Sequence, residues 1–125
     1  MDNFIIIIGL FAFHYLADFT HLSTPWMLKA KYLGKPLFPI FCHALVHALL
    51  MCGFLYFYTN INTLINLFLL QLITHFIIDT LKGNINYFFP NVTDNKKPVH
   101  WYVFGFDQLL HNIVIVIMYL MVIRK

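Results

Sequence analysis

The chain has 125 residues, of which 61% are hydrophobic and only 10% are charged. A soluble domain carries about 25% charged residues to cover its surface, so this composition excludes a water-soluble monomer and indicates a membrane protein. Two cysteines are too few for a disulfide-rich secreted scaffold, and the lysines are too scattered for a nucleic-acid interface. The length allows a single membrane domain covering residues 1–125.

Four apolar stretches predict an all-α fold, a bundle of four transmembrane helices. They cover about residues 3–19, 37–58, 64–81 and 101–123. A helix needs about 20 residues to cross the bilayer core, so the first and third stretches must include flanking residues. The turn at residues 59–62 is long enough only for an antiparallel hairpin, which makes the second and third helices neighbours.

Two longer segments separate the other helices. Residues 24–33 predict a short interfacial helix, because Ser23 or Thr24 can cap it and Pro25 suits its first position. Residues 83–100 contain prolines and several asparagines, and we expect a surface loop without internal structure there.

The basic residues predict the orientation of the chain in the membrane. The side with the two long segments carries Lys29, Lys31, Lys35, Lys82, Lys96 and Lys97. The other side carries only Arg124 and Lys125. The positive-inside rule therefore places the long loops in the cytoplasm and both termini outside.

Each predicted helix carries one pair of metal-binding side chains at spacing i, i+4. The pairs are His14 with Asp18, His43 with His47, His75 with Asp79, and Asp107 with His111. This spacing puts both members of a pair on one helix face, and all four pairs lie towards the side with the long loops. An ionised aspartate at mid-membrane costs roughly 2.5 to 3.5 kcal/mol, which a bound cation would offset. We therefore expect the eight side chains to converge on a metal centre.

The donor set indicates the metal and its chemistry. Imidazole and carboxylate suit divalent transition metals, and eight ligands exceed the four of one tetrahedral zinc. We expect two ions, zinc first, with manganese or iron as alternatives. Asp18, Asp79 and Asp107 are the catalytic candidates, because an aspartate that is not fully engaged as a ligand can act as general base. The residues alone do not say which one. A single histidine on an apolar helix is more often a packing residue, so the prediction depends on the four pairs together.

Five further polar residues surround the predicted ligands. Gln71 and Gln108 are candidates to orient imidazoles, although polar contacts between helices explain them equally well. Lys82 could pair with the aspartate three residues before it, hold a phosphate, or simply extend to the membrane surface as lysines commonly do. Lys29 and Lys31 could join it in attracting an anionic headgroup.

Five short motifs follow one another in a fixed order. They are His-x3-Asp-Phe from His14, Trp-Met followed by lysine from Trp26, His-x3-His from His43, His-x3-Asp-x2-Lys from His75, and Asp-Gln-x2-His from Asp107. Together they resemble the DUF3307 family of small bacterial and phage membrane proteins, over nearly the whole chain. Many relatives carry a glutamine shortly after the Asp-Phe pair, where this chain has His21 and Leu22. The resemblance implies no established activity. A distant similarity to YdjM-like membrane proteins, a group described as metal-dependent hydrolases, implies hydrolysis by analogy only.

Two functions of different classes fit these observations. The first is a metal-dependent hydrolase near the cytoplasmic face, acting on a phosphoester or acyl bond of a lipid or lipid-linked substrate. The second is a non-enzymatic metal protein, either a carrier of divalent ions or a bundle held together by metal. Confinement of the ligands to one leaflet favours the first. A small pore or lysis factor would explain the size of the chain but not the pairs. We expect membrane lipid as a partner, and the oligomeric state stays open.

Overall fold

The computed structural model describes residues 2–124. Within that range the chain is all-helical, with α1 (Asp2–Phe19), α2 (Pro25–Leu33), α3 (Leu37–Leu55), α4 (Ile61–Phe88), a short 3-10 helix η1 (Pro90–Thr93) and α5 (Pro98–Ile123). Four of the helices in the described range, α1, α3, α4 and α5, are long and apolar enough to cross a membrane, which confirms the predicted fold class.

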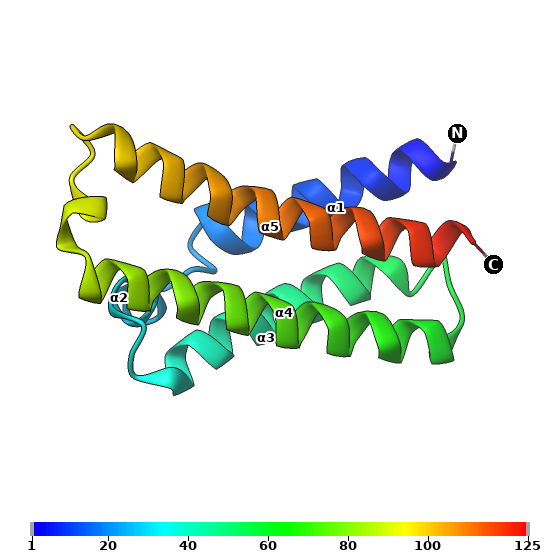
Figure 1. Ribbon diagram of the computed structural model, residues 1–125. Coiled ribbons are helices and arrows are strands. Elements are labelled where there is room, and N and C mark those ends of the chain that lie inside the picture. Colours follow the sequence, from blue (N-terminus) through cyan, green and yellow to red (C-terminus); the bar gives the residue numbers. More distant parts are fainter. Residues whose placement is uncertain (1, 125) are drawn as a thin grey trace.

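The four long helices form an antiparallel bundle, and α2 lies across one end of it (Figure 1). α1 packs on α3 and α5, and α4 packs on the same two helices. In the described part of the chain the backbones of the diagonal pairs do not touch, so side chains fill the centre. The start of α1 and the end of α5 lie at the end of the bundle opposite α2 (Figure 1).

Local signals set most of the helix ends. Asn60 caps α4, and its Oδ1 accepts a hydrogen bond from the backbone of Thr63 at 2.9 Å. This cap makes α4 begin at Ile61, earlier than predicted, while α3 already ends at Leu55. Thr24 caps α2 through the backbone of Met27 at 3.4 Å, as one of the two expected caps.

The largest difference from the predicted helices lies after residue 81. We expected a loop there, but α4 continues to Phe88. The reason is a tertiary contact: Gly34, in the left-handed conformation that ends α2, lies directly on Gly83. A Cβ atom added to Gly83 would come within 2.2 Å of the backbone nitrogen of Gly34. One turn further, Asn86 Nδ2 donates to the carbonyl of Tyr32 at 3.1 Å. These contacts with α2 keep the polar end of α4 helical.

The segment between α4 and α5 also has structure that we did not predict. It contains η1, and it is also tied to the start of α5: His100 Nδ1 lies 2.8 Å from the carbonyl oxygen of Val92. The indole of Trp101 donates to the carbonyl of Asn95 at 2.9 Å. Pro98 occupies the first turn of α5, which therefore begins three residues earlier than predicted.

Towards the termini the bundle has an apolar interior. The buried side chains are Ile6, Leu10, Met51, Cys52, Leu55, Leu67, Val114, Ile115, Met118 and Val122. α1 approaches α3 closely at this end, because Gly9 faces the ring of Phe54 and a Cβ there would lie 2.2 Å from the ring. We call this region the apolar half of the bundle. The other half contains the predicted ligands.

Candidate metal centre

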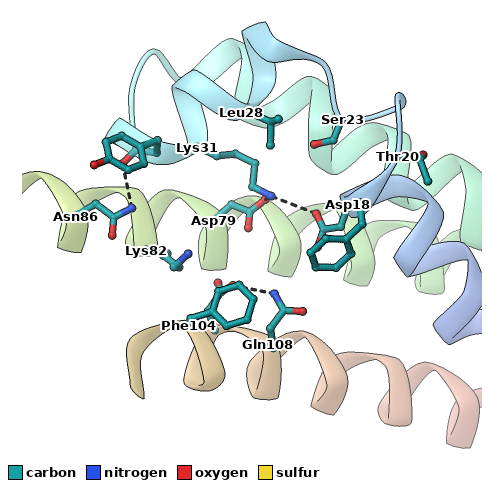
Figure 2. A pocket seen from close by; sticks show the side chains of 13 residues that line it. Asp18, Thr20, Ser23, Leu28, Lys31, Asp79, Lys82, Asn86, Phe104 and Gln108 are labelled. Carbon is teal, nitrogen blue, oxygen red and sulfur yellow. Dashed lines mark hydrogen bonds and ion pairs between the residues drawn. The ribbon is translucent and has the colours of Figure 1, made fainter. Parts of the chain in front are cut away.

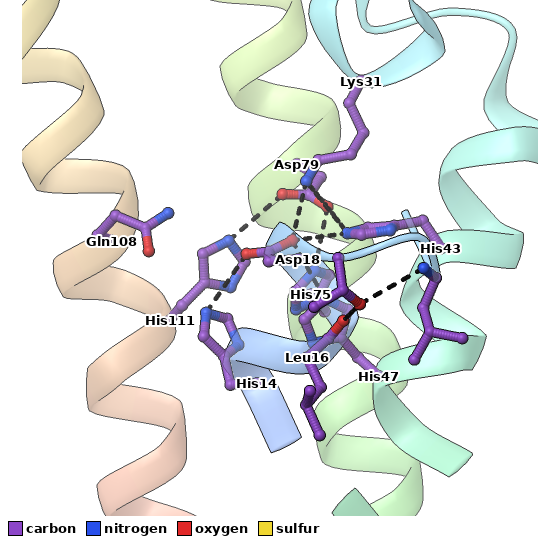
Figure 3. A network of polar contacts seen from close by, with 12 residues as sticks. His14, Leu16, Asp18, Lys31, His43, His47, His75, Asp79, Gln108 and His111 are labelled. Carbon is purple, nitrogen blue, oxygen red and sulfur yellow. Dashed lines mark hydrogen bonds and ion pairs between the residues drawn. The ribbon is translucent and has the colours of Figure 1, made fainter. Parts of the chain in front are cut away.

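Seven of the eight predicted side chains point into the centre of the bundle, in the half that α2 covers (Figure 3). The eighth, Asp107, is buried on α5 one turn before His111. His43, His47 and His75 are at most 1% exposed. On α4 the buried positions recur every four residues, from Leu67 through His75 and Asp79 to Gly83. The i, i+4 spacing therefore does what the sequence predicted: it aims both members of each pair inward.

The side chains form two groups. Within each group the ligand atoms all lie within 4.8 Å of one another. One group consists of Asp18, His43, His47 and His75, and the other of His75, Asp79 and His111. His75 belongs to both, and its ring stacks on that of His47 with centroids 3.7 Å apart. Two neighbouring groups with imidazole and carboxylate donors are what a dinuclear site requires.

His14 and Asp107 belong to neither group but lie directly beside them. His14 Nε2 is 3.4 Å from Asp18 Oδ2. Asp107 Oδ1 is 3.6 Å from His111 Nε2. The structure thus brings all eight predicted residues together but gives these two a peripheral position.

Lys31 is a member of the cluster that we did not predict. Its Nζ lies 3.1 Å from Asp18 Oδ1, 3.1 Å from His43 Nε2 and 3.6 Å from Asp79 Oδ2. Burial alone would lower the pKa of this ammonium, but Asp79 and Asp18 outweigh the burial and raise the pKa above its ordinary value of 10.5. A positive charge therefore lies between the two carboxylates, where a metal ion would also be stabilised.

The chain did carry a signal for Lys31. Met27, Ala30 and Gly34 are buried and follow a helical period, which places Lys31 on the inner face of α2. Lys29, which we had grouped with Lys31, is exposed. The two lysines therefore have different roles, although their sequence context is similar.

The two glutamines lie next to predicted ligands. Gln71 Nε2 is 3.3 Å from His75 Nδ1, and Gln108 Nε2 donates to Asp107 Oδ2 at 3.1 Å. These contacts can fix the orientation of a ligand side chain.

Several buried polar atoms of the cluster have neighbours but no hydrogen bond. His75 Nε2 and Asp79 Oδ2 lie 3.1 Å apart, yet neither makes a hydrogen bond within residues 2–124. Asp107 Oδ1 is also buried without one in that range. Because a buried polar group costs free energy unless it is paired, such atoms are available as metal ligands or proton acceptors.

A cavity of about 450 Å³ adjoins the cluster, between α2, α4, α5 and the end of α1 (Figure 2). All three membrane aspartates, Asp18, Asp79 and Asp107, line it, together with Lys31 and Lys82. Lys82 makes no ion pair with Asp79, nor with any other carboxylate in the described range, which removes one of the three predicted roles. The wall of the cavity therefore carries both signs of charge among apolar side chains such as Phe19, Leu28 and Phe104.

Comparison with known proteins identifies a family. The family model described as "Protein of unknown function (DUF3307)" matches residues 6–125, almost the full length. Neither the curated proteins nor the solved structures contain a match to this chain. The description of the family names no activity, so the function has to be argued from the site. With the fold, the ordered motifs and this match in agreement, the chain belongs to the DUF3307 family.

Proposed function

We propose that this protein is a membrane-embedded, metal-dependent hydrolase that cleaves a phosphoester of a lipid or lipid-linked substrate, with an acyl ester as the alternative bond. The observation that carries the proposal is the pair of adjoining ligand groups that share His75. The imidazole-rich donor set suits two zinc ions, with manganese or iron as alternatives.

The charge of the cluster supports cation binding. Three carboxylates, those of Asp18, Asp79 and Asp107, belong to the cluster, and Lys31 is the one lysine that pairs with any of them within the described residues, through Asp18 and Asp79. With neutral imidazoles the cluster is therefore net negative in a region of low dielectric constant, where uncompensated charge is costly. A divalent cation would offset this charge, and it would also supply the Lewis acidity that hydrolysis of a phosphoester needs.

The cavity supports an anionic amphiphile as substrate. Lys31 and Lys82 line it, and the amides of Asn86 and Gln108 add hydrogen-bond donors. Ammonium and amide groups bind phosphate oxygens through charge-assisted hydrogen bonds. An uncharged acyl ester would make no use of the two lysines, so the phosphoester fits better.

Asp107 is the best candidate for general base. It lines the cavity, lies outside both ligand groups, and keeps Oδ1 free of hydrogen bonds within the described residues while Gln108 holds Oδ2. In the proposed reaction the oxygen of water bonds to phosphorus, and the bond from phosphorus to the lipid oxygen breaks. Asp107 takes the proton of the water, and this proton is passed on to the leaving oxygen, which departs as an alcohol.

An ion carrier is less well supported by the shape of the interior. The ligand groups lie in one half of the bundle, and the other half is filled by Leu10, Met51, Met118 and their apolar neighbours. Within residues 2–124 no buried polar or charged residue continues the cluster through that apolar half, whereas an ion pathway requires one. Under the positive-inside rule the lysine distribution predicts that the cavity lies on the cytoplasmic side.

Elemental analysis tests the metal centre. Protein purified without chelators should contain about two divalent ions per chain. His47→Ala should lose about one of them, whereas His21→Ala, at an exposed histidine outside the cluster, should lose none. A wild-type protein that contains no stoichiometric amount of metal contradicts both the hydrolase and the carrier.

Activity separates the enzyme from a non-enzymatic metal protein. Wild-type protein should release phosphate from lipid phosphomonoesters in mixed micelles. Asp79→Asn and treatment with a chelator should abolish the release, and Asp94→Asn, in the loop before α5, should not change it. Ion flux into liposomes without any hydrolysis would instead identify a carrier.

A further inference from the structure

A small groove runs between α4 and α5, next to the cavity. Its volume is about 120 Å³. Two facing stripes line it, each with side chains three or four residues apart on one helix. The apolar members are Ile78, Leu81 and Ile85 on α4, and Val103, Phe106 and Leu110 on α5.

Lys82 and Asp107 complete the two stripes and connect the groove to the cavity, because both residues line both spaces. The ammonium of Lys82 lies 5.6 Å from the centre of the Phe104 ring. Within residues 2–124 it makes no hydrogen bond or ion pair. An unpaired ammonium at the junction of an apolar groove and a cavity lined by charged groups matches an anion that carries a hydrocarbon chain.

The groove opens towards the membrane. Leu81 and Phe106 are 57% and 61% exposed, and both lie on helices apolar enough to span a bilayer. The medium around such positions is lipid hydrocarbon. A lipid chain could therefore enter sideways without crossing water. With a volume of about 120 Å³, the groove has room only for the first few methylene groups of a chain, the part nearest the head.

Resting on the proposed function, we infer that a lipid phosphomonoester reaches the centre sideways from the bilayer, between α4 and α5. The first methylene groups of one hydrocarbon chain occupy the groove. Lys82 binds the phosphate where the groove meets the cavity, and the ester bond then faces Asp107.

Binding of uncleavable analogues tests this inference independently of catalysis. Hexadecylphosphonate carries the charge and the chain, butylphosphonate the charge with a short chain, and hexadecanol the chain alone. Their binding to the metal-loaded protein in maltoside micelles can be followed by NMR titration. We expect hexadecylphosphonate to bind at least about tenfold more tightly than either of the others.

Two matched pairs of variants locate the binding. Lys82→Met should weaken the binding of hexadecylphosphonate about tenfold or more, because the charge-assisted hydrogen bond is lost. Lys82→Arg should restore the binding, because this hydrogen bond is regained. Lys29→Met removes the same charge from the exposed face of α2 and should have no effect. Ile85→Trp fills the groove. It should weaken the binding of hexadecylphosphonate about tenfold and leave the binding of butylphosphonate unchanged. Ile77→Trp makes the same change on α4 outside the groove and should be neutral.

The outcomes separate the groove from the hydrolase. Equal binding of the long and short phosphonates, or binding that Lys82→Met leaves unchanged, overturns the inference and reduces Lys82 to a residue that extends to the membrane surface. A dimer that Ile85→Trp dissociates overturns it as well, because a second copy would then occupy the groove. If the binding pattern is as expected but no phosphoester is cleaved, the groove stands and the proposed hydrolase fails. If cleavage occurs but the groove variants do not alter its dependence on chain length, the hydrolase stands and the groove fails.

Discussion

The two halves of the bundle are built from the same four helices but hold together in different ways. Near the termini the interior consists of leucine, isoleucine, valine and methionine, together with Cys52, packed against one another. Under α2 histidine and aspartate side chains meet in the interior, and the ligand atoms of each of their two groups lie within 4.8 Å of one another. On α4 the change occurs within two turns, from Leu67 through Gln71 to His75.

This contrast indicates how a small membrane protein can combine stability with the proposed reactive site. In lipid the packing of apolar side chains holds helices together, and polar side chains contribute only where they find partners. The apolar half is held together by such packing alone. In the polar half only part of the polar side chains find partners, because several buried atoms there make no hydrogen bond within the described residues. We therefore expect substitutions in the two halves to affect different measurements.

The largest effect is expected from Asp107→Asn in the polar half. If Asp107 is the general base, hydrolysis should slow by about 10²- to 10⁴-fold, because proton transfer is lost while the ligand groups remain. Phosphate release and metal content measured on the same sample check this. Asp94→Asn serves as the control. Loss of metal from the Asp107 variant would show that this carboxylate is a ligand instead.

A substitution in the apolar half should change stability and leave the chemistry intact. Leu67→Ala leaves a cavity at a fully buried position, so the free energy of unfolding should fall by about 2 to 5 kcal/mol. Leu69→Ala, at a position that is 47% exposed, should change it by no more than about 0.5 kcal/mol. Unfolding in mixed micelles gives both values. Reduced metal content in the folded Leu67 variant would contradict the independence of the two halves.

The boundary between the halves should show an intermediate effect. Gln71→Leu removes the amide next to His75 Nδ1 and should weaken metal binding about 10- to 100-fold. Asn66→Leu makes the same kind of change at an exposed position of α4 and should leave metal affinity unchanged. Competition with a chelator of known affinity measures the difference. Equal affinities for the wild type and the Gln71 variant would make this contact one of packing only.

The smallest effect is expected at the cap of α2, which covers the polar half. Thr24→Ala removes the hydrogen bond to the backbone of Met27 and should destabilise the first turn of α2 by about 1 kcal/mol. Hydrogen exchange of the amides in that turn should then be about fivefold faster. Thr24→Ser keeps the oxygen and should exchange like the wild type. An accelerated exchange in the apolar half as well would mean that α2 supports the whole bundle.

The sequence predicted the four long helices and the eight clustered residues because both depend on local patterns. Apolar length identifies a membrane helix, and the i, i+4 spacing puts two ligands on one face whatever the neighbouring helices do. The tertiary contacts were not predictable in this way. The helical end of α4 depends on Gly83 lying against Gly34, a contact between residues far apart in the chain. The helical period puts Lys31, unlike Lys29, on one face of α2 with Ala30 and Gly34, but only the docking of α2 shows that this face meets Asp18.

The contact between Gly34 and Gly83 also bears on how fast the centre can exchange its contents. Since their backbones touch, α2 cannot tilt away from α4 without breaking the packing at this point. The ammonium of Lys31, by contrast, ends a flexible side chain beside an open cavity of about 450 Å³. Side chains change rotamer within nanoseconds, whereas helices shift over microseconds to milliseconds. If the centre binds a cation as proposed, rotation of one lysine is the faster route by which that ion would reach or leave Asp18 and Asp79, and the surrounding scaffold can remain still.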